Sequence, residues 1–243
     1  MTELLKEIKI IHAGDSAVFC RISNDIDPGI SRRIVAFHKL VSSMKQQGII
    51  ESVPSYTGLT VYYNPLIISD LEIKSILSDQ YNSITNEVPG SKERMLKIPV
   101  CYDKEFSPDI SFVAENHNLD IRDVVELHTA STYLVYMIGF TPGFPYMGGL
   151  DKRLETPRKK EPRTKIYAGS IGIAGKQTGI YPIDSPGGWQ IIGKTPLRLY
   201  EQSRTSPFLF KAGDMVSFYQ ISIREYNSIS EELRSGIFNL EIQ

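Results

Sequence analysis

Residues 177–196, with the sequence QTGIYPIDSPGGWQIIGKTP, hold the chain's single tryptophan and decide how its second half folds. Within this stretch, residues 188–195 read GWQIIGKT and match the G-x-x-x-x-G-K-[ST] pattern of a phosphate-binding loop. Such a loop joins a strand to a helix. Here residues 189–192 have the composition of a strand, and Pro196 disfavours a helical Thr195. We therefore interpret the match as accidental and predict a β-hairpin with its turn at residues 184–188.

The whole chain has the composition of a globular protein with a real core. It has 243 residues, 41% of them hydrophobic, and a formal net charge of -1, which suits one large or two small domains and argues against a nucleic-acid-binding protein. The start of the chain is unlike a signal peptide, and no apolar run is long enough for a membrane span. We therefore expect a cytoplasmic protein with no membrane segment.

The cysteines and histidines indicate no metal site. Cys20 and Cys101 stand far apart in apolar, strand-like runs, which predicts reduced core thiols. The four histidines show no metal-ligand spacing.

Residues 1–88 are expected to form a small α+β domain, with two helices on one antiparallel sheet. Strand-like runs at residues 7–23 and 49–64 each contain a turn signal. Asp27 and Pro28 are suited to open a helix, and Ser69 or Asp70 is suited to cap a second one. The polar segment around Pro89 predicts the domain boundary.

Residues 92–243 are expected to form a mainly-β domain. A strand and two short helices come first, at residues 94–103, 107–118 and 120–130. From residue 132 on, Gly and Pro interrupt a series of short apolar runs. The last two of these runs are residues 197–201 and 214–222. Many short strands with frequent turn signals predict a barrel or a sandwich.

The first candidate site is an aromatic loop at residues 138–150, IGFTPGFPYMGGL. Phe140 and Phe144 alternate there with prolines and glycines, which fix a loop shape rather than a regular element. Aromatic rings on a rigid loop can form the wall of an apolar pocket. The alternative is an ordered loop that covers one end of the barrel, and the sequence favours neither.

The second candidate is a basic run at residues 156–166, TPRKKEPRTKI. Arg158 and Arg163 are the side chains in it that we expect to bind a carboxylate or phosphate, because guanidinium binds both bidentately. A solvated surface is the alternative. His128, near the end of a predicted helix, is also a candidate substrate-binding residue. The alternative, a favourable contact of the imidazole with the helix C-terminus, is favoured over a proton-transfer role, which would need a neighbouring carboxylate and a cleft. No catalytic residue can be assigned.

Four segments, in order along the chain, resemble the motifs of one known family. They are IPVCYD, LHTASTYLVYMIGFTPGFPYMGGL, TPRKKEPRTKIYAGSIGIAGKQTGIYPIDSPGGWQIIGKTP and GDMVSFY. The family is that of the 5-oxoprolinase B subunit, also known as the KipI-type histidine-kinase inhibitors or allophanate hydrolase subunit 1. The resemblance implies a cyclophilin-like barrel for residues 92–243. It also implies that Arg commonly stands where this chain has Lys194.

The resemblance further implies an enzyme subunit that does not act alone. It implies that the chain works with the 5-oxoprolinase subunits A and C in a complex that uses ATP to open 5-oxoproline to L-glutamate, with the location of the ATP site left open. Two alternatives remain: a regulatory inhibitor that binds a sensor histidine kinase, and a carboxyltransferase-like subunit of a urea carboxylase or allophanate hydrolase system.

For this chemistry, we expect three stiff loops to converge on one groove of the barrel. The loop at 138–150 would supply aromatic walls and the basic run would supply guanidinium groups, while the third loop would supply backbone amide donors. The residues expected in this third loop are Gln177, Thr178 and Tyr181 for substrate orientation, Gly187 and Gly188 for the amides, and Trp189 at the base.

Overall fold

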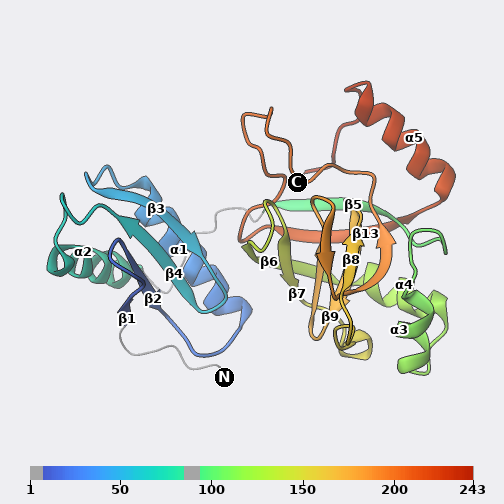
Figure 1. The fold of residues 1–243 in the computed structure, drawn as a ribbon, viewed down its shortest axis with the longest axis horizontal. Coiled ribbons are helices and arrows are strands. Elements are labelled where there is room, and N and C mark those ends of the chain that lie inside the picture. The colour runs from blue at the N-terminus through green and yellow to red at the C-terminus, as the bar shows by residue number, and fades with distance from the viewer. Residues whose placement is uncertain (1–7, 85–93, 243) are drawn as a thin grey trace. The chain divides into compact units, whose positions relative to one another are not determined.

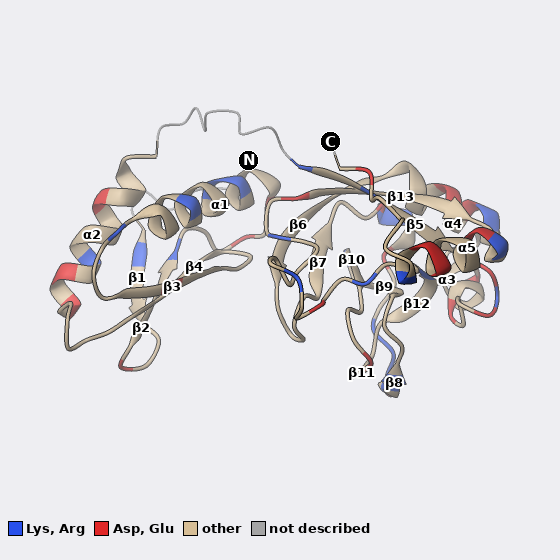
Figure 2. Cartoon of the chain, turned by 90° about the horizontal axis from the view of Figure 1, so that it is seen from above, with Lys and Arg blue, Asp and Glu red and all other residues tan. Residues whose placement is uncertain are grey.

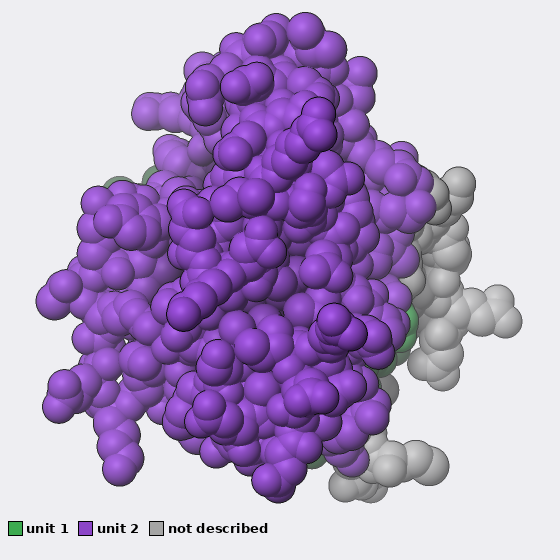
Figure 3. Space-filling view, turned by 90° about the vertical axis from the view of Figure 1, so that its right-hand side faces the viewer, with its two compact units in different colours: residues 1–92 green, residues 93–243 purple. Residues whose placement is uncertain are grey.

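The computed structural model describes residues 8–84 and 94–242, which form two compact units, 1–92 and 93–243. Figure 3 colours these units separately and shows one face of the larger one. The predicted boundary around Pro89 lies outside the described residues. Among the residues that are described, no helix has both the length and the apolar character needed to span a membrane.

The first unit contains a four-stranded antiparallel sheet in the order β1-β2-β4-β3. Its elements are β1 (Lys9–His12), β2 (Ala17–Arg21), α1 (Pro28–Ser43), β3 (Ile49–Pro54), β4 (Gly58–Tyr63) and α2 (Asp70–Asn82). Figure 1 shows α1 along the sheet, where it packs against β3 and β4. The core between the layers includes Cys20, Phe37 and Leu77.

Local signals explain where the two helices of this unit begin. The Asp27 side chain accepts hydrogen bonds from the backbone N–H groups of Gly29 and Ile30, and Pro28 occupies the first helical position. At α2, Ser69 rather than Asp70 is the cap, and it forms a reciprocal capping box with Glu72.

The second unit is built on a closed barrel of seven strands, in the order β10-β7-β6-β13-β5-β12-β9. β5 and β13 pair in parallel, and the other neighbours pair antiparallel. The barrel strands are β5 (Met95–Cys101), β6 (Thr132–Ile138), β7 (Pro145–Gly148), β9 (Ser170–Ala174), β10 (Gln177–Ile180), β12 (Gln190–Lys194) and β13 (Met215–Ile221). The predicted choice between barrel and sandwich is therefore settled in favour of a barrel.

The remaining elements lie outside the barrel wall. They are α3 (Ile110–Asn116), α4 (Ile121–Ala130), the 3₁₀ turn η1 (Lys152–Leu154), β8 (Arg163–Ile166), β11 (Ser185–Gly187) and α5 (Ile223–Arg234). β8 and β11 pair with each other as a separate two-stranded ribbon. Figure 2 shows this ribbon projecting from the barrel, and it shows both acidic and basic residues along α5.

The predicted hairpin within residues 177–196 is wrong, although its two strands exist. β10 and β12 do not pair with each other; both pair with β9, one on each side. The tight hairpin is β9–β10, whose ladder ends at Ala174 opposite Gln177, with Gly175 at φ +56° in the turn. That hairpin occupies one edge of β9, so β12 adds to the other edge, and residues 185–187 pair with β8 instead of forming a turn.

Three smaller expectations also differ from the structure. Residues 145–148 of the aromatic loop form strand β7, because their backbone pairs with β6 and β10. Residues 197–201 are not a strand and contribute only an isolated bridge from Tyr200 to Phe208. The helix α5 is not among the predicted elements, although Ser222 and Glu225 form a capping box at its start.

The barrel core makes a direct prediction about stability. Ile98 of β5 is fully buried in this core, whereas Ile237 is 69% exposed. Ile98→Ala should lower the free energy of unfolding by about 2–5 kcal/mol because it leaves a cavity, and Ile237→Ala should change it by less than about 0.5 kcal/mol. Urea unfolding of the two variants measures this difference. Equal stabilities would contradict the assigned core.

Candidate functional site

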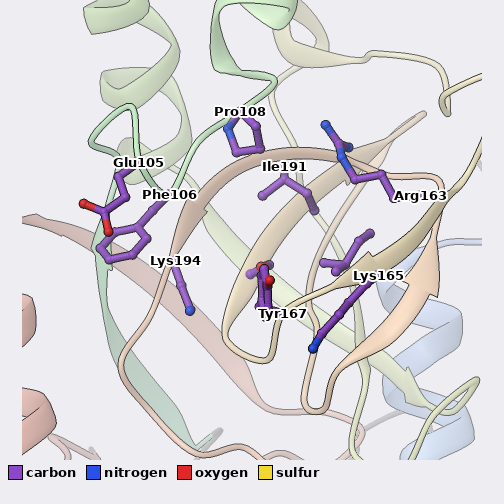
Figure 4. A pocket seen from close by; sticks show the side chains of 10 residues that line it. Glu105, Phe106, Pro108, Arg163, Lys165, Tyr167, Ile191 and Lys194 are labelled. Carbon is purple, nitrogen blue, oxygen red and sulfur yellow. The ribbon is translucent and has the colours of Figure 1, made fainter.

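A pocket of about 390 Å³ opens beside the end of β12, between the β8–β11 ribbon and the segment that follows β5. Figure 4 shows the side chains around it. The lining residues are Glu105, Phe106, Pro108, Arg163, Lys165, Ile166, Tyr167, Ser170, Ile191 and Lys194. Three cations therefore meet apolar and aromatic walls, in a volume that suits a small ligand.

Asp109 fixes the position of the first of these cations. Both guanidinium NH₂ groups of Arg163 donate to the Asp109 carboxylate, at 2.8 and 2.7 Å. Lys159 donates to the same carboxylate at 3.1 Å, and the backbone N–H of Ile191 donates to it at 2.7 Å. The Asp109 N–H in turn donates to the Ile191 carbonyl at 3.0 Å. This carboxylate thus ties the start of α3 to the ribbon and to β12.

Asp109 is nearly fully buried, and its charge is stabilised by its donors. Burial by itself raises the pKa of the Asp109 carboxyl. The hydrogen bonds from Arg163, the Ile191 N–H and Lys159 outweigh burial, so the pKa lies below its usual value. A lowered pKa means that Asp109 stabilises the folded chain above the unfolded pKa of about 4 and that this stabilisation is lost as the pH falls through the folded pKa.

The other two cations of the pocket differ in their pairing. Lys165 Nζ lies 2.9 Å from the Asp184 carboxylate. Lys194 has no carboxylate within 4 Å among the residues that the structure describes. Its Nζ instead lies 5.4 Å from the centre of the Phe106 ring and 5.6 Å from that of Tyr167. Of the pocket's three cations, Lys194 is therefore the one without a directly paired carboxylate among the described residues, although its charge acts on Asp184 from beyond 4 Å.

Next to the pocket lies a packed aromatic cluster, which we define as Phe144, Tyr146, Tyr181 and Trp189. The Phe144 ring is 5.1 Å from Tyr181 and 5.3 Å from Trp189, both edge-on, and Tyr146 is 5.9 Å from Trp189. The Arg158 guanidinium stands over the Trp189 ring, 6.0 Å from its centre. The three predicted segments therefore meet, but Phe144, Tyr181 and Trp189 are buried and their contacts are packing contacts.

The structure gives the glycines of the third loop a packing role. A Cβ on Gly187 would lie 2.3 Å from the Tyr181 hydroxyl, so the close approach of ribbon and cluster requires glycine there. The Gly188 carbonyl accepts a hydrogen bond from the Lys159 N–H at 2.7 Å. Burial raises the pKa of Tyr181 to about 12. The backbone N–H of Trp189, which donates a hydrogen bond to the Tyr181 hydroxyl, lowers this pKa by a smaller amount. The backbone N–H that follows Gly188, that of Trp189, therefore already donates a hydrogen bond to Tyr181.

Phe140 and Gln177 lie at the edges of this arrangement. Phe140 is 65% exposed, has a positive φ of 65°, and lies 6.1 Å edge-on from Phe144. Such a φ is uncommon for a non-glycine residue. Gln177 is half-buried at the start of β10, opposite Gly148 of β7 and Ala174 of β9.

His128 and Thr178 belong to a buried network inside the barrel. The Tyr102 hydroxyl is 2.7 Å from Nδ1 of His128, and Nε2 is 3.1 Å from the Thr178 hydroxyl. Thr178 donates in turn to the Gly172 carbonyl at 3.1 Å. These contacts fit a neutral imidazole that accepts from Tyr102 and donates to Thr178. The ring also stacks on Phe218, with centres 4.6 Å apart.

The interpretation of His128 as a contact with the helix C-terminus is therefore wrong, because both ring nitrogens bond to Tyr102 and Thr178 instead. Complete burial lowers the pKa of His128 to about 3, because the charged form has no water around it. A neutral ring gains nothing from the helix dipole.

Sequence reasoning missed Asp109, Lys194, Phe106 and Tyr167 as parts of one pocket. Asp109 occupies the N-cap position of α3, but its side chain makes no cap bond there and turns to Arg163 instead. Lys194 is the lysine of the phosphate-loop match. Because that match was interpreted as accidental, no role was predicted for Lys194. The signal that could have placed it is the strand pattern of residues 190–194, which puts Lys194 at a strand end.

The described ranges, 8–84 and 94–242, contain no group of three or more His, Cys, Asp or Glu side chains arranged to hold a metal ion. The pocket's chemistry is that of lysine and arginine, which suits anions rather than metals.

Comparison with known proteins places the chain in a family. A sequence model described as the carboxyltransferase domain, subdomain C and D, matches residues 8–210. The chain is also 40% identical over 234 residues to the 5-oxoprolinase B subunit of Bacillus subtilis, in a match that covers 92% of this chain and 97% of that protein. The chain belongs to the 5-oxoprolinase B subunit family. The resemblance inferred from the sequence motifs is thus confirmed.

Two solved structures share the fold of this chain. The crystal structure of the protein TTHA0988 is 32% identical, with a TM-score of 0.75, and matches 85% of this chain. This chain spans only 40% of the length of that one. The urea amidolyase of Kluyveromyces lactis matches 99% of this chain and 17% of its own, with a TM-score of 0.79 at 20% identity, and so shows likeness of fold alone.

The Asp109 carboxylate gives the first prediction about the site. Asp109→Asn should destabilise the chain by about 2 kcal/mol or more, because it leaves two cations facing a neutral amide. The half-exposed Lys165–Asp184 pair is the matched control, and Asp184→Asn should cost less than about 1 kcal/mol. Urea unfolding at pH 7 compares them, and equal losses would show that Asp109 does not hold the site together.

The neutral His128 gives a prediction about pH. Unfolded histidine binds a proton near pH 6.5, whereas folded His128 does so only near pH 3. The free energy of unfolding should therefore fall between pH 6 and pH 4.5, with His128 contributing up to about 1.4 kcal/mol per pH unit. His128→Gln should remove that part of the slope. An imidazole that titrates above pH 5.5 by NMR would contradict the buried network.

Proposed function

We propose that this chain is the B subunit of an ATP-dependent 5-oxoprolinase complex, which opens 5-oxoproline to L-glutamate. The observation that carries the proposal is the 40% identity to the 5-oxoprolinase B subunit of Bacillus subtilis over almost the full length of both chains. The cationic pocket beside β12 adds support, because both the substrate and ATP are anions.

The reaction requires activation of a poor electrophile. The carbonyl of a lactam resists attack by water because its nitrogen donates electron density. Transfer of the γ-phosphoryl group of ATP to the carbonyl oxygen releases ADP and creates a leaving group. Water then adds to the carbon, and the C–N bond breaks with a proton passing to nitrogen, which leaves an acyl phosphate. A second water hydrolyses this acyl phosphate and releases phosphate and L-glutamate. Such a sequence needs cations for the phosphoryl group and donors for the developing negative charge.

The described residues fit part of this task. Arg163, Lys165 and Lys194 offer cations around one pocket, and Arg158 adds another over Trp189. The phosphate-loop letters at residues 188–195 do not form a phosphate loop, since residues 190–194 are a barrel strand with no helix after them. We therefore propose that the ATP site lies on another member of the complex.

The partners that we propose are the 5-oxoprolinase subunits A and C. The name of the Bacillus subtilis relative marks it as one subunit of a larger enzyme. In this chain, most carboxylates and cations at the pocket neutralise one another, and the described part of the chain presents no complete set of nucleophile, base and ATP site. The cytoplasmic location expected from the sequence stays a prediction.

A carboxyltransferase-like subunit is the second candidate function. The match of residues 8–210 to the carboxyltransferase domain, subdomain C and D, favours it. A test with biotin-dependent carboxylation of urea would separate it from the first proposal. The regulatory binding of a sensor histidine kinase stays a sequence-based hypothesis that no described feature tests.

Reconstitution tests the proposed function. The purified chain alone should release no glutamate from 5-oxoproline and ATP, because it lacks a complete catalytic set. An equimolar mixture with subunits A and C from the same organism should release glutamate and phosphate in an ATP-dependent way. Robust turnover by this chain alone, or a fully assembled but inactive mixture, would overturn the proposal.

A further inference from the structure

Lys194, which has no directly paired carboxylate within the described ranges, is the feature of the pocket that points to a ligand. Arg163 is bound by Asp109, and Lys165 is bound by Asp184. Lys194 is half-buried at the end of β12, and its Nζ lies against two aromatic rings. Its charge acts on Asp184, but within the described ranges no carboxylate lies within 4 Å of it. An ammonium group that has lost part of its water and lacks a directly paired carboxylate favours binding of an anion.

The shape of the pocket narrows the class of anion. Figure 4 shows the Lys194 side chain between the rings of Phe106 and Tyr167, with Pro108 and Ile191 beyond. These walls suit a compact apolar body carrying one charged group. The cavity of about 390 Å³ has room for a five-membered ring with a carboxylate.

The charge balance argues against a polyphosphate at this position. Glu105 also lines the pocket, and the carboxylates of Asp109 and Asp184 already neutralise the other two cations. A chain of phosphates carries several negative charges and needs several free donors. The strand geometry of residues 190–194 does not offer the row of backbone N–H groups that a phosphate loop supplies.

We propose that Lys194 binds the carboxylate of 5-oxoproline, with the lactam ring packed against the apolar and aromatic walls of the pocket. The inference rests on the proposed function and goes beyond it by assigning substrate binding to this chain and to this side chain. The carboxylate stays unchanged in the reaction, so Lys194 is a binding residue and takes no part in proton or phosphoryl transfer.

Calorimetric titration of the full chain with 5-oxoproline tests the assignment. Lys194→Met should weaken binding by roughly 10-fold to 100-fold, as expected for loss of a charge-assisted hydrogen bond. Lys194→Arg should stay within about threefold of the original chain, because it keeps the charge. Lys176→Met, at the exposed β9–β10 turn, is the matched control and should change nothing. Circular dichroism confirms that each variant is folded.

Three ligands separate the possible occupants. 2-Pyrrolidone has the lactam ring without the carboxylate and should bind weakly and equally to the original chain and to Lys194→Met. Inorganic phosphate and ATP should show no dependence on Lys194. If ATP or phosphate, but not 5-oxoproline, loses affinity in Lys194→Met, the site binds phosphate and the proposal is wrong.

The reconstituted complex distinguishes failure of this inference from failure of the proposed function. In an active complex, Lys194→Met should raise the KM for 5-oxoproline by roughly tenfold or more and leave the KM for ATP unchanged. Unaltered kinetics for 5-oxoproline would refute the role of Lys194 and leave the function standing. A complex that is inactive with every variant would refute the function, and the titration of the chain would then decide the inference by itself.

Discussion

The buried carboxylate of Asp109 is the interaction on which the candidate site depends. Three elements that are far apart in the sequence reach it: the basic run through Lys159 and Arg163, β12 through the Ile191 N–H, and α3 through its own backbone. Arg163 and Lys159 would otherwise repel each other at close range. With the carboxylate between them, the β8–β11 ribbon is held against the barrel, and the pocket beside β12 acquires its walls.

A second consequence of this carboxylate concerns the remaining cations. Because Asp109 pairs with Arg163 and Asp184 pairs with Lys165, Lys194 is the cation of the pocket that has no directly paired carboxylate among the described residues. The aromatic cluster next to it is packed too tightly to bind a ligand itself, but it fixes the ribbon through Tyr181 and Trp189. Charge and packing therefore have separate roles: the charge of Lys194 attracts the ligand, and the aromatic cluster holds the ribbon that forms a wall of the pocket.

The sequence predicted much of the local structure and little of the long-range pairing. Caps such as Asp27 and Ser69 act within four residues, so the sequence shows them directly. The partners of β12 depend on which strand occupies each edge of β9, and this is decided by the tight turn at Gly175 rather than by the Pro and Gly residues at 186–188. The helix α5 was missed although its sequence carries local signals: Ser222 and Glu225 form a capping box, and apolar residues from Ile223 to Leu233 recur at helical spacing.

The candidate site was predicted only in part, for a related reason. Phe144, Arg158, Tyr181 and Trp189 do come together, since Pro and Gly hold their loops in fixed shapes. Asp109 resembles an ordinary residue at a helix start, and only the folded chain brings Arg163 to it across 54 positions. Lys194 lies in a stretch that matches the phosphate-loop sequence pattern, but residues 190–194 of this stretch form strand β12. In the sequence, His128 stands near a helix C-terminus, where a contact with the helix end is expected. Only its burial in the folded chain lowers its pKa and keeps the imidazole neutral.

If Asp109 holds Arg163 in place, Lys194 alone is left to receive the carboxylate of the substrate. A crystal structure of the assembled complex with 5-oxoproline and a non-hydrolysable ATP analogue decides whether this is so. We expect the carboxylate of 5-oxoproline at hydrogen-bond distance from Lys194 Nζ, with the two Arg163–Asp109 hydrogen bonds intact and the nucleotide bound elsewhere. A 5-oxoproline bound away from this pocket, or an Arg163 that has left Asp109 to bind it, would contradict the assignment.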